Sequence, residues 1–373
     1  MPDKVLQHKC VDCHAVFPHG FTPRCPSCRG MVEVYYDLSR AELYDSDNSL
    51  ERFFDLLPLQ NRESLLSLGE GNTPCHHAVA LGEAFGLEQV YLKIESKNPT
   101  GTTKDRMAAV VLSLFNELGI REFITSSTGN SSNALAHAIS VHPQFHMHLF
   151  MGEAFAHLFR YDGEGIEFHV MSKKDFTEAF NHARDLAHER GIPFEAGFFN
   201  PARREGLKLA YFESVDQIPR PIDWYFQAIS SAMGVQGTAK GAAELKAMGR
   251  IPHVPRMVGV QQESCCPMVK AFEEDSPTIQ PHHIFEKPDG LAKAILRGNP
   301  TGCYPYVYRM LRETNGLAIS VSESEIRDAC DRVLELEGVT CGYAAAATVA
   351  ALEKLAERGA VQTQDVLLLN LTG

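Results

Sequence analysis

Short apolar runs alternate with amphipathic stretches from about residue 85 to the end of the chain. The strand-like runs, rich in β-branched and aromatic residues, cover 89–94, 122–125, 145–150, 223–229, 257–260 and 365–371. Helical stretches begin at Lys104, at Asn130, near Gln236 and near Ser322, which has capping-box spacing to Glu325. This alternation predicts an α/β fold with a mostly parallel sheet that is covered by helices.

Two closely spaced cysteine pairs lie near the N-terminus. Cys10 and Cys13 form the first pair, and Cys25 and Cys28 form the second. Four thiolates with these two-residue spacers are typical of a zinc ribbon, whose closed tetrahedral shell leaves no position open for a reacting water. The pattern therefore predicts a structural Zn2+, and the alternative is four reduced thiols without a metal.

The overall composition limits the classes of function. A chain of 373 residues is longer than one typical domain, and its formal net charge of -12 argues against nucleic acid as a partner, because binding phosphates requires a basic face. No apolar stretch approaches the roughly 20 residues of a membrane span, and the first residues lack the pattern of a secretory leader. We therefore expect a cytoplasmic protein that contacts neither nucleic acid nor membrane.

Lys104 lies directly after a turn and at the start of a predicted helix, in the segment from Asn98 to Arg106. An amine must lose its proton before it attacks a carbonyl, and the positive end of a helix dipole disfavours the charged ammonium. Lys104 is therefore a candidate covalent anchor for a carbonyl cofactor. On this pattern alone, a solvated lysine at a helix start is the more common case.

Two loops of small residues each connect a predicted strand with a predicted helix. The first runs from Ser126 to Asn133 and the second from Ile229 to Gly237. Backbone N–H groups in such loops bind anions at a helix N-terminus, so the first suits a substrate carboxylate and the second a phosphate. The alternative for the first loop is a polar N-terminal cap. The second lacks the glycine spacing of a dinucleotide fingerprint or a Walker loop.

Four ordered motifs combine into a family pattern. The motifs are Leu68-Gly-Glu-Gly-Asn-Thr-Pro74, Asn98-Pro-Thr-Gly-Thr-Thr-Lys-Asp-Arg106, Ser127-Thr-Gly-Asn130 and Asn200-Pro-Ala-Arg-Arg-Glu-Gly206. Together they resemble the threonine synthase family of fold-type II pyridoxal-phosphate enzymes, whose relatives include cysteate synthases with an N-terminal zinc ribbon. The resemblance implies a zinc ribbon and lead-in (1–40), a large cofactor-binding domain (41–109 with 211–373) and a small α/β domain (110–210), as in enzymes like the tryptophan synthase β subunit.

The resemblance also implies roles for individual residues. Lys104 matches the lysine that binds pyridoxal 5'-phosphate and moves the α-proton of the substrate, and Asn130 matches the asparagine that contacts the phenolic oxygen of the cofactor. The positions that match the loop for the substrate carboxylate are Ser127, Thr128 and Ser131. The positions in place of the phosphate loop are Ser230, Ser231, Ala232, Met233 and Gly234. Thr372 matches the hydroxyl residue that faces the pyridine nitrogen.

Asn200 and Arg203 match positions near the distal anion of the substrate in threonine synthases. A fixed guanidinium binds phosphate through two N–H groups, so their presence favours a substrate with an anionic leaving group. The alternative is that Arg203 is an ordinary charged residue at a helix start.

Two departures from the family pattern leave the substrate undefined. Met233 interrupts the small residues of the phosphate loop, and Cys341-Gly-Tyr-Ala-Ala-Ala replaces the usual Glu-Pro-Ala-Ser segment. We expect a homodimeric enzyme that converts O-phosphohomoserine to threonine, or phosphoserine and sulfite to cysteate. One alternative is a pyridoxal-phosphate-dependent dehydratase, lyase or specialised synthase with another amino-acid substrate. An alternative from another class is a non-catalytic protein whose zinc ribbon binds a partner.

Overall fold

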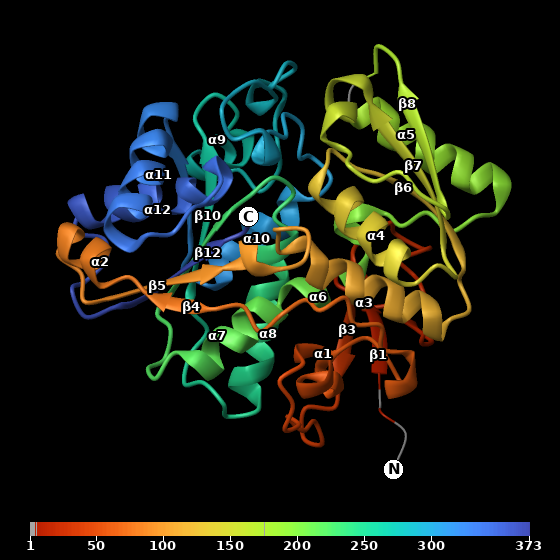
Figure 1. Ribbon diagram of the computed structural model, residues 1–373, viewed down its shortest axis with the longest axis horizontal. Helices are drawn as coiled ribbons and strands as arrows, with labels where there is room; N and C mark the ends of the chain where they lie inside the picture. The colour runs from red at the N-terminus through yellow and green to blue at the C-terminus, as the bar shows by residue number, and fades with distance from the viewer. Residues whose placement is uncertain (1–3, 5, 175) are drawn as a thin grey trace. The chain divides into compact units, whose positions relative to one another are not determined.

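The computed structural model describes residues 4, 6–174 and 176–373. The chain divides into two compact units, which can be followed by residue colour in Figure 1. The first unit contains Met1–Asn72 and Asn98–Leu209, and the second contains Thr73–Lys97 and Ala210–Gly373. Each unit is thus assembled from two separate stretches of the chain. The expected boundaries of the ribbon, large and small domains remain a prediction.

The first unit contains two three-stranded sheets. Its strands are β1 (Leu6–Cys10), β2 (Val16–Phe17), β3 (Val32–Tyr36), β6 (Glu122–Ser126), β7 (His146–Gly152) and β8 (Ile166–Met171). Its helices are α1 (Ser49–Arg52), α3 (Lys104–Glu117), α4 (Asn130–Val141), α5 (Phe176–Arg190) and α6 (Pro201–Leu207). Its 3-10 turns are η1 (Phe54–Leu56), η2 (Arg62–Ser64), η4 (Glu153–Leu158) and η5 (Gly197–Phe199). The sheet β2-β1-β3 is antiparallel, whereas β6-β7-β8 is parallel.

Helix α3 forms the centre of the first unit. Eleven consecutive residues from Asp105 to Phe115 are buried, because α3 packs against α4 and α6. On the parallel sheet, Ile124 and Phe150 pack against Ala183 and Ala187 of α5. The first residue of α3, Lys104, lies at the end of this buried helix and is itself half-buried.

The second unit contains one six-stranded sheet in the order β11-β10-β9-β12-β5-β4. Its strands are β4 (Cys75–His77), β5 (Gln89–Ile94), β9 (Trp224–Ala228), β10 (Arg256–Gln262), β11 (Leu317–Val321) and β12 (Val366–Leu371). Its helices are α2 (Val79–Phe85), α8 (Met233–Ala247), α9 (Pro267–Glu273), α10 (Tyr304–Glu313), α11 (Glu323–Glu337) and α12 (Tyr343–Glu357), and α7 (Leu209–Gln217) begins at its border. Its 3-10 turns are η3 (Glu95–Lys97), η6 (Pro281–His283) and η7 (Lys293–Ile295). Only β4 runs antiparallel to its neighbour; the other strand pairs are parallel.

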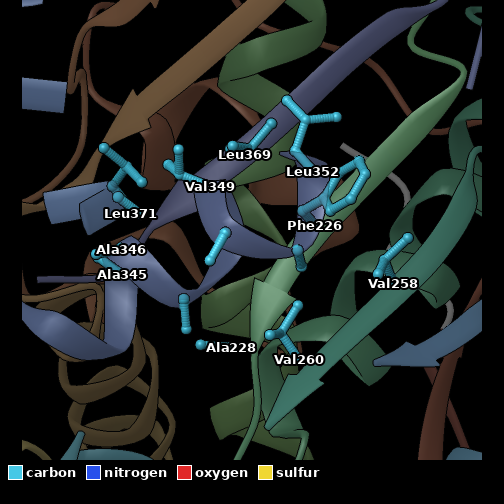
Figure 2. Packing of buried hydrophobic residues seen from close by; sticks show 14 of the residues in the cluster. Phe226, Ala228, Val258, Val260, Ala345, Ala346, Val349, Leu352, Leu369 and Leu371 are labelled. Carbon is cyan, nitrogen blue, oxygen red and sulfur yellow. The ribbon is translucent and has the colours of Figure 1, made fainter. Parts of the chain in front are cut away.

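The main core of the second unit lies between this sheet and α12. Figure 2 shows Phe226 of β9 and Leu369 of β12 beside Val349 and Leu352 of α12. Successive strand residues point to opposite faces, so Phe226 faces this core while its neighbour Gln227 faces the other side. Helix α12 is rich in alanine, and its small side chains allow the helix to lie close to the sheet.

The structure confirms the predicted α/β fold class. The expected strand 89–94 coincides with β5, the helices expected at Lys104 and Asn130 begin there, and the capping box of Ser322 and Glu325 is formed. Helix α8 begins at Met233, earlier than the expected start near Gln236, because Ala232 has a left-handed φ of 64° and ends the preceding loop. Among the described residues, no helix combines the length and apolar character needed to cross a bilayer.

Candidate active site

The turn before α3 fixes the position of Lys104. The carboxylate of Asp105 accepts hydrogen bonds from the backbone N–H of Thr100 at 2.7 Å and from its hydroxyl at 2.9 Å. The N–H of Gly101 donates to the carbonyl of Asn98 at 2.8 Å, and Gly101 has a φ of 79°, which favours glycine. The turn is therefore closed from both sides, and Lys104 leaves it at the N-terminal end of α3.

The buried side chain of Asn98 joins two of the sequence motifs. Its Oδ1 accepts a hydrogen bond from the N–H of Gly71 at 3.0 Å. The adjacent Glu70 is 5% exposed; its Oε2 accepts from the N–H of Leu68 at 2.6 Å, but its Oε1 has no hydrogen-bond partner among the described residues. Burial raises the pKa of Glu70 to about 7, although hydrogen bonds and the charge of Arg106 oppose the shift. Glu70 therefore titrates near neutral pH.

The loop from β6 to α4 is organised by the hydroxyl of Ser127. This oxygen accepts hydrogen bonds from the N–H groups of Gly129 at 3.3 Å and Ser132 at 3.2 Å. Gly129 has a φ of 140°, a conformation that other residues rarely adopt. Asn130 is the first residue of α4 and, like Thr128, is half-buried, whereas Ser127 is buried. The loop thus presents Thr128 and Asn130 at the N-terminus of a helix.

Arg203 belongs to a buried ion pair that sequence reasoning did not anticipate. Its Nε and Nη2 donate to the two carboxylate oxygens of Glu195, and its Nη1 donates to the hydroxyl of Ser131 at 3.2 Å. The side chains of Arg203 and Glu195 are 4% and 0% exposed. The structure therefore brings Ser131 and Arg203 together within the first unit and leaves Nη1 as the group of Arg203 that is directed away from Glu195.

Glu195 also accepts hydrogen bonds from three further groups. Its Oε1 accepts from Nδ2 of Asn200 at 2.8 Å, and its Oε2 accepts from the hydroxyl of Thr125 at 3.1 Å and the N–H of Gly197 at 3.3 Å. Oδ1 of Asn200 caps α6 by accepting from the N–H of Ala202 at 3.0 Å. Both polar groups of Asn200 are thus used within the protein, and its expected contact with a substrate stays a prediction.

The position of Glu195 depends on a contact that is distant in the sequence. Its N–H donates to the carbonyl of Ile124 at 2.9 Å, and Phe194 forms an isolated parallel bridge with Ile124. Glu195 therefore extends the sheet beside β6, next to the loop of Ser127. A single acidic residue in an apolar stretch was the only signal in the sequence.

The rest of the Asn200–Gly206 motif connects α6 to its neighbours in the first unit. Nη2 of Arg204 donates to the carbonyl of Val32 in β3 at 2.6 Å, and the hydroxyl of Tyr36 donates to Glu205 at 2.7 Å. A Cβ atom at Gly206 would lie 2.5 Å from the carbonyl oxygen of Arg106, so α6 and α3 cross where only glycine fits. The three charged residues of the motif therefore have separate structural partners.

In the second unit, the loop after β9 leads into α8, whose N-terminus has no side-chain cap. The residues Ser230, Ser231 and Ala232 lead to α8, and no side-chain hydrogen bond from Ala232 caps its first turn. Free backbone N–H groups at a helix N-terminus are suited to bind an anion. Met233 lies at the first position of α8, and its side chain does not change the backbone donors.

The position of Gly234 leaves no space for a side chain. A Cβ atom there would lie 2.2 Å from Nε2 of Gln227. Gln227 is held in place because its Oε1 accepts from the hydroxyl of Tyr225 at 3.0 Å, and that hydroxyl accepts from Nδ2 of Asn370 at 2.7 Å. The hydrogen-bonded side chains of Asn370, Tyr225 and Gln227 therefore pack against the first turn of α8.

Thr372 follows β12 directly and is half-buried. Because β12 and β9 are parallel neighbours, with Leu369 opposite Phe226, Thr372 and the loop from Ser230 emerge at the same edge of the sheet. Gly342, in the segment that departs from the family pattern, also lies close to the chain end: a Cβ atom there would be 3.6 Å from the carbonyl carbon of Gly373. Thr372, the loop and Gly342 thus share one edge of the second unit.

Two buried hydroxyls in the first unit lack a hydrogen-bond partner among the described residues. They are Oγ1 of Thr103 and Oγ of Ser126, which adjoin Lys104 and Ser127 in the sequence. A buried hydroxyl without a partner costs free energy, so both atoms are available to a polar ligand.

The four N-terminal cysteines form one cluster. The sulfurs of Cys10 and Cys28 lie 3.5 Å apart, as do those of Cys13 and Cys25, and all four lie within 4.8 Å of one another. Zinc with Zn–S bonds of about 2.3 Å requires sulfurs about 3.8 Å apart. The spacing therefore suits a tetrahedral ion.

Both cysteine pairs have the same backbone turn. The carbonyl of Cys10 accepts from the N–H of His14 at 3.1 Å, and that of Cys25 accepts from the N–H of Arg29 at 2.9 Å. His14 and Arg29 have left-handed φ angles of 60° and 66°. Two equivalent turns that direct paired thiols at one point are typical of a zinc ribbon.

Comparisons with known proteins agree with this architecture. A family model described as pyridoxal-phosphate dependent enzyme matches residues 66–373. The threonine synthase of Methanosarcina acetivorans is 31% identical, over 98% of this chain and 90% of that protein. The cysteate synthase of Methanospirillum hungatei is 25% identical, over 98% of this chain and 88% of that protein. The processed form of threonine deaminase isoform 2 from Solanum lycopersicum has a similar fold, with a TM-score of 0.66 at 18% identity over 90% of this chain and 92% of that one.

Proposed function

The chain belongs to the family of pyridoxal-phosphate dependent enzymes, and from this premise we propose that it removes an anionic leaving group from a small amino acid. O-phosphohomoserine, converted to threonine, is the first candidate substrate. The observation that carries the proposal is the network of Ser131, Arg203 and Glu195, which holds a buried guanidinium against the loop suited to a substrate carboxylate. The alternative of a non-catalytic protein has no support in the family match.

The described residues fit pyridoxal 5'-phosphate. The uncapped start of α8 offers backbone donors for the phosphate, and the unpartnered hydroxyls of Thr103 and Ser126 are sites for polar contacts beside the anchor and the carboxylate loop. The residues that would hold the cofactor are Lys104, Asn130, Ser230, Ser231, Ala232, Met233, Gly234 and Thr372. When bound, the cofactor supplies an electron sink that makes the α-proton of the amino acid acidic.

Lys104 is the proposed base for that proton. Its position at the first residue of α3 disfavours the ammonium form, because the helix dipole is positive there. A neutral amine at Nζ accepts the α-proton and returns it at a later step. The hydrogen bonds from Thr100 to Asp105 close the turn from which the side chain of Lys104 extends.

Ser127, Thr128 and Ser131 are proposed to orient the carboxylate of the substrate at the N-terminus of α4. The hydroxyl of Ser131 also accepts a hydrogen bond from Nη1 of Arg203. One connected network would therefore bind both the carboxylate and the phosphate of a phosphorylated amino acid. Glu195 accepts hydrogen bonds along the Nε–Nη2 edge of the guanidinium and fixes its orientation. Arg203 then offers Nη1 to the leaving phosphate, and Glu195 acts as a positioning residue.

The four N-terminal cysteines are proposed to bind one structural Zn2+. Their tetrahedral spacing supports this assignment. Strand β3 of the ribbon holds α6 through the bond from Arg204 to Val32, so zinc would stabilise the helix that carries Arg203. We also propose a cytoplasmic homodimer, which light scattering on the purified protein would test.

A substrate screen tests the proposed function. Purified holoenzyme is incubated with O-phosphohomoserine, with phosphoserine and sulfite, and with unphosphorylated homoserine and serine, while phosphate and amino-acid products are quantified. We expect phosphate release with threonine as the product; cysteate from the second mixture would support the candidate suggested by the cysteate synthase relative. Keto-acid formation from serine without phosphate release from either phosphorylated substrate would instead support a dehydratase and contradict the proposal.

A further inference from the structure

A cluster of histidine and glutamate side chains lies on the parallel sheet of the first unit. It contains Glu122 of β6, His146 and His148 of β7, and Glu167 and His169 of β8. The strand register places Glu122 opposite His146 and Glu167 opposite His148. The cluster lies toward the N-terminal ends of these strands, whereas the loop of Ser127 follows the C-terminal end of β6. It is therefore separate from the candidate active site.

His148 lies between two carboxylates. Its Nε2 is 2.8 Å from Oε1 of Glu122, and its Nδ1 is 3.0 Å from Oε2 of Glu167. A neutral imidazole has only one N–H to donate. The other nitrogen of a neutral ring carries a lone pair that faces a carboxylate, and a cation bound between the two groups would satisfy both.

His169 supplies a second, independent observation. Its Nε2 is buried and makes no hydrogen bond among the described residues, although it lies 3.6 Å from Oε2 of Glu167. The ring is stacked on Phe150, with centroids 4.5 Å apart, so it is held in this orientation. The same carboxylate oxygen of Glu167 is thus approached by one nitrogen of His148 and one of His169.

We propose that His148, Glu167 and His169 bind a divalent transition-metal cation, with Zn2+ as the probe ion. One ligand atom from each of the three residues lies within 4.8 Å of the others. Two imidazoles and a carboxylate are a ligand set that zinc accepts, with water completing the shell.

Neighbouring side chains form hydrogen bonds to two of the proposed ligands, His148 and Glu167. Metal-binding histidines usually donate their other N–H to a carboxylate, which fixes the tautomer. Glu122 accepts from Nε2 of His148 and would leave Nδ1 free for the metal. His146 contacts the other oxygen of Glu167 at 3.1 Å and would orient that ligand.

Metal binding would have a structural consequence for β8. This strand lies at the edge of its sheet, pairs with β7 on one side and is largely half-buried or exposed. An ion held by His148 of β7 and by Glu167 and His169 of β8 would cross-link the two strands. Amide hydrogen exchange in β8 should then slow when the ion binds.

Zinc stoichiometry of the full-length holoenzyme tests the proposal. Wild type and the variants His169→Ala and Glu167→Gln are dialysed against buffered Zn2+, and bound zinc per chain is measured by elemental analysis. His188→Ala, which removes an exposed histidine of α5 outside the cluster, is the matched control. We expect wild type and the control to bind one more zinc than either cluster variant, because the cysteine site is unchanged in all four proteins.

Equal zinc content in all four proteins would overturn the proposal. Far-ultraviolet circular dichroism shows whether each variant is folded. If His169→Ala is not folded, Glu167→Gln decides the result, since the side chain of Glu167 is 50% exposed and its amide replacement is mild. Zinc should also slow hydrogen exchange in β8 of wild type but not of Glu167→Gln; an equal effect in both would contradict the cross-link.

Discussion

Replacing Glu195 by alanine should destabilise the first unit strongly. The change removes the carboxylate that Arg203, Asn200, Thr125 and Gly197 all contact. The guanidinium of Arg203 would remain buried and would keep its hydrogen bond to the hydroxyl of Ser131 at 3.2 Å. An uncompensated buried charge is the main cost, and the orphaned donors add to it.

The magnitude follows from the burial of the pair. Breaking a buried ion pair by removing one partner costs about 3–5 kcal/mol. The neighbouring donors are coupled to the same carboxylate, so their separate costs of about 1–3 kcal/mol do not simply add. We therefore expect Glu195→Ala to lower the free energy of unfolding by about 3–5 kcal/mol.

Urea unfolding of wild type and variants, followed by circular dichroism, measures this loss. Glu178→Ala is the matched control, because Glu178 forms a surface pair with Lys174 at 2.8 Å in which both side chains are 48% exposed. An exposed ion pair of this kind contributes only about 0.2–1 kcal/mol. A loss below about 1 kcal/mol for Glu195→Ala, close to that of the surface control, would refute the reasoning.

A double variant separates the ion pair from simple packing. If the cost arises from the buried charge, Glu195→Leu with Arg203→Met should recover part of the stability lost by Glu195→Ala, since no uncompensated charge remains. A double variant that is no more stable than Glu195→Ala would show that the packing of this region, rather than its charge, determines the loss.

Further predictions concern the cofactor anchor, a titrating glutamate, a packed glycine and the cysteine cluster. Lys104→Ala should abolish turnover while circular dichroism stays unchanged, because it removes both the covalent anchor and the base; turnover near the wild-type rate would contradict this role. The pKa of Glu70 is raised from 4.5 to about 7, so its stabilising contribution is fully present below pH 4.5 and is lost as pH rises to about 7. This amounts to about 3 kcal/mol, and Glu70→Gln should flatten the urea midpoints in that range, whereas an unchanged pH dependence would rule out Glu70 as the cause. Gly234→Ala places a Cβ atom 2.2 Å from Nε2 of Gln227 and should weaken cofactor binding in a spectroscopic titration, while Gly163→Ala, with no atom within 4 Å of its Cβ, should not; equal affinities would argue against the phosphate loop. Elemental analysis should find zinc in protein purified without chelator, and its loss when the four cysteines are replaced by serine; a metal-free wild type would contradict the ribbon assignment.

The sequence predicted the local elements well where pattern and backbone chemistry agree. The capping box of Ser322 and Glu325 and the helix start at Lys104 depend on neighbouring residues, so they were visible without the fold. Strand β8 was not predicted, because an exposed edge strand with the sequence Ile-Glu-Phe-His-Val-Met lacks a long apolar run. The early start of α8 depends on the φ of Ala232, which residue type alone does not specify.

Only those site residues that belong to a sequence motif could be predicted. The resemblance pointed to Arg203, but its partner Glu195 is placed by a bridge between Phe194 and Ile124, a contact between distant parts of the chain. The structural use of Asn200 was hidden for the same reason, since its capping bond and its bond to Glu195 exist only after folding. Residue roles that depend on long-range pairing cannot be derived from spacing.

The proposed binding of an anionic leaving group by Arg203 is tested most directly by a double-difference cycle. The ratio kcat/KM is measured for O-phosphohomoserine and for an uncharged analogue, in wild type and in Arg203→Ala. Comparing two substrates in one variant cancels any effect of the unpaired Glu195 on the enzyme itself. We predict that the phosphorylated substrate loses about 2–4 kcal/mol more than the uncharged one, or about 30- to 900-fold. Equal losses for the two substrates would show that Arg203 only supports the structure and would contradict recognition of an anionic leaving group.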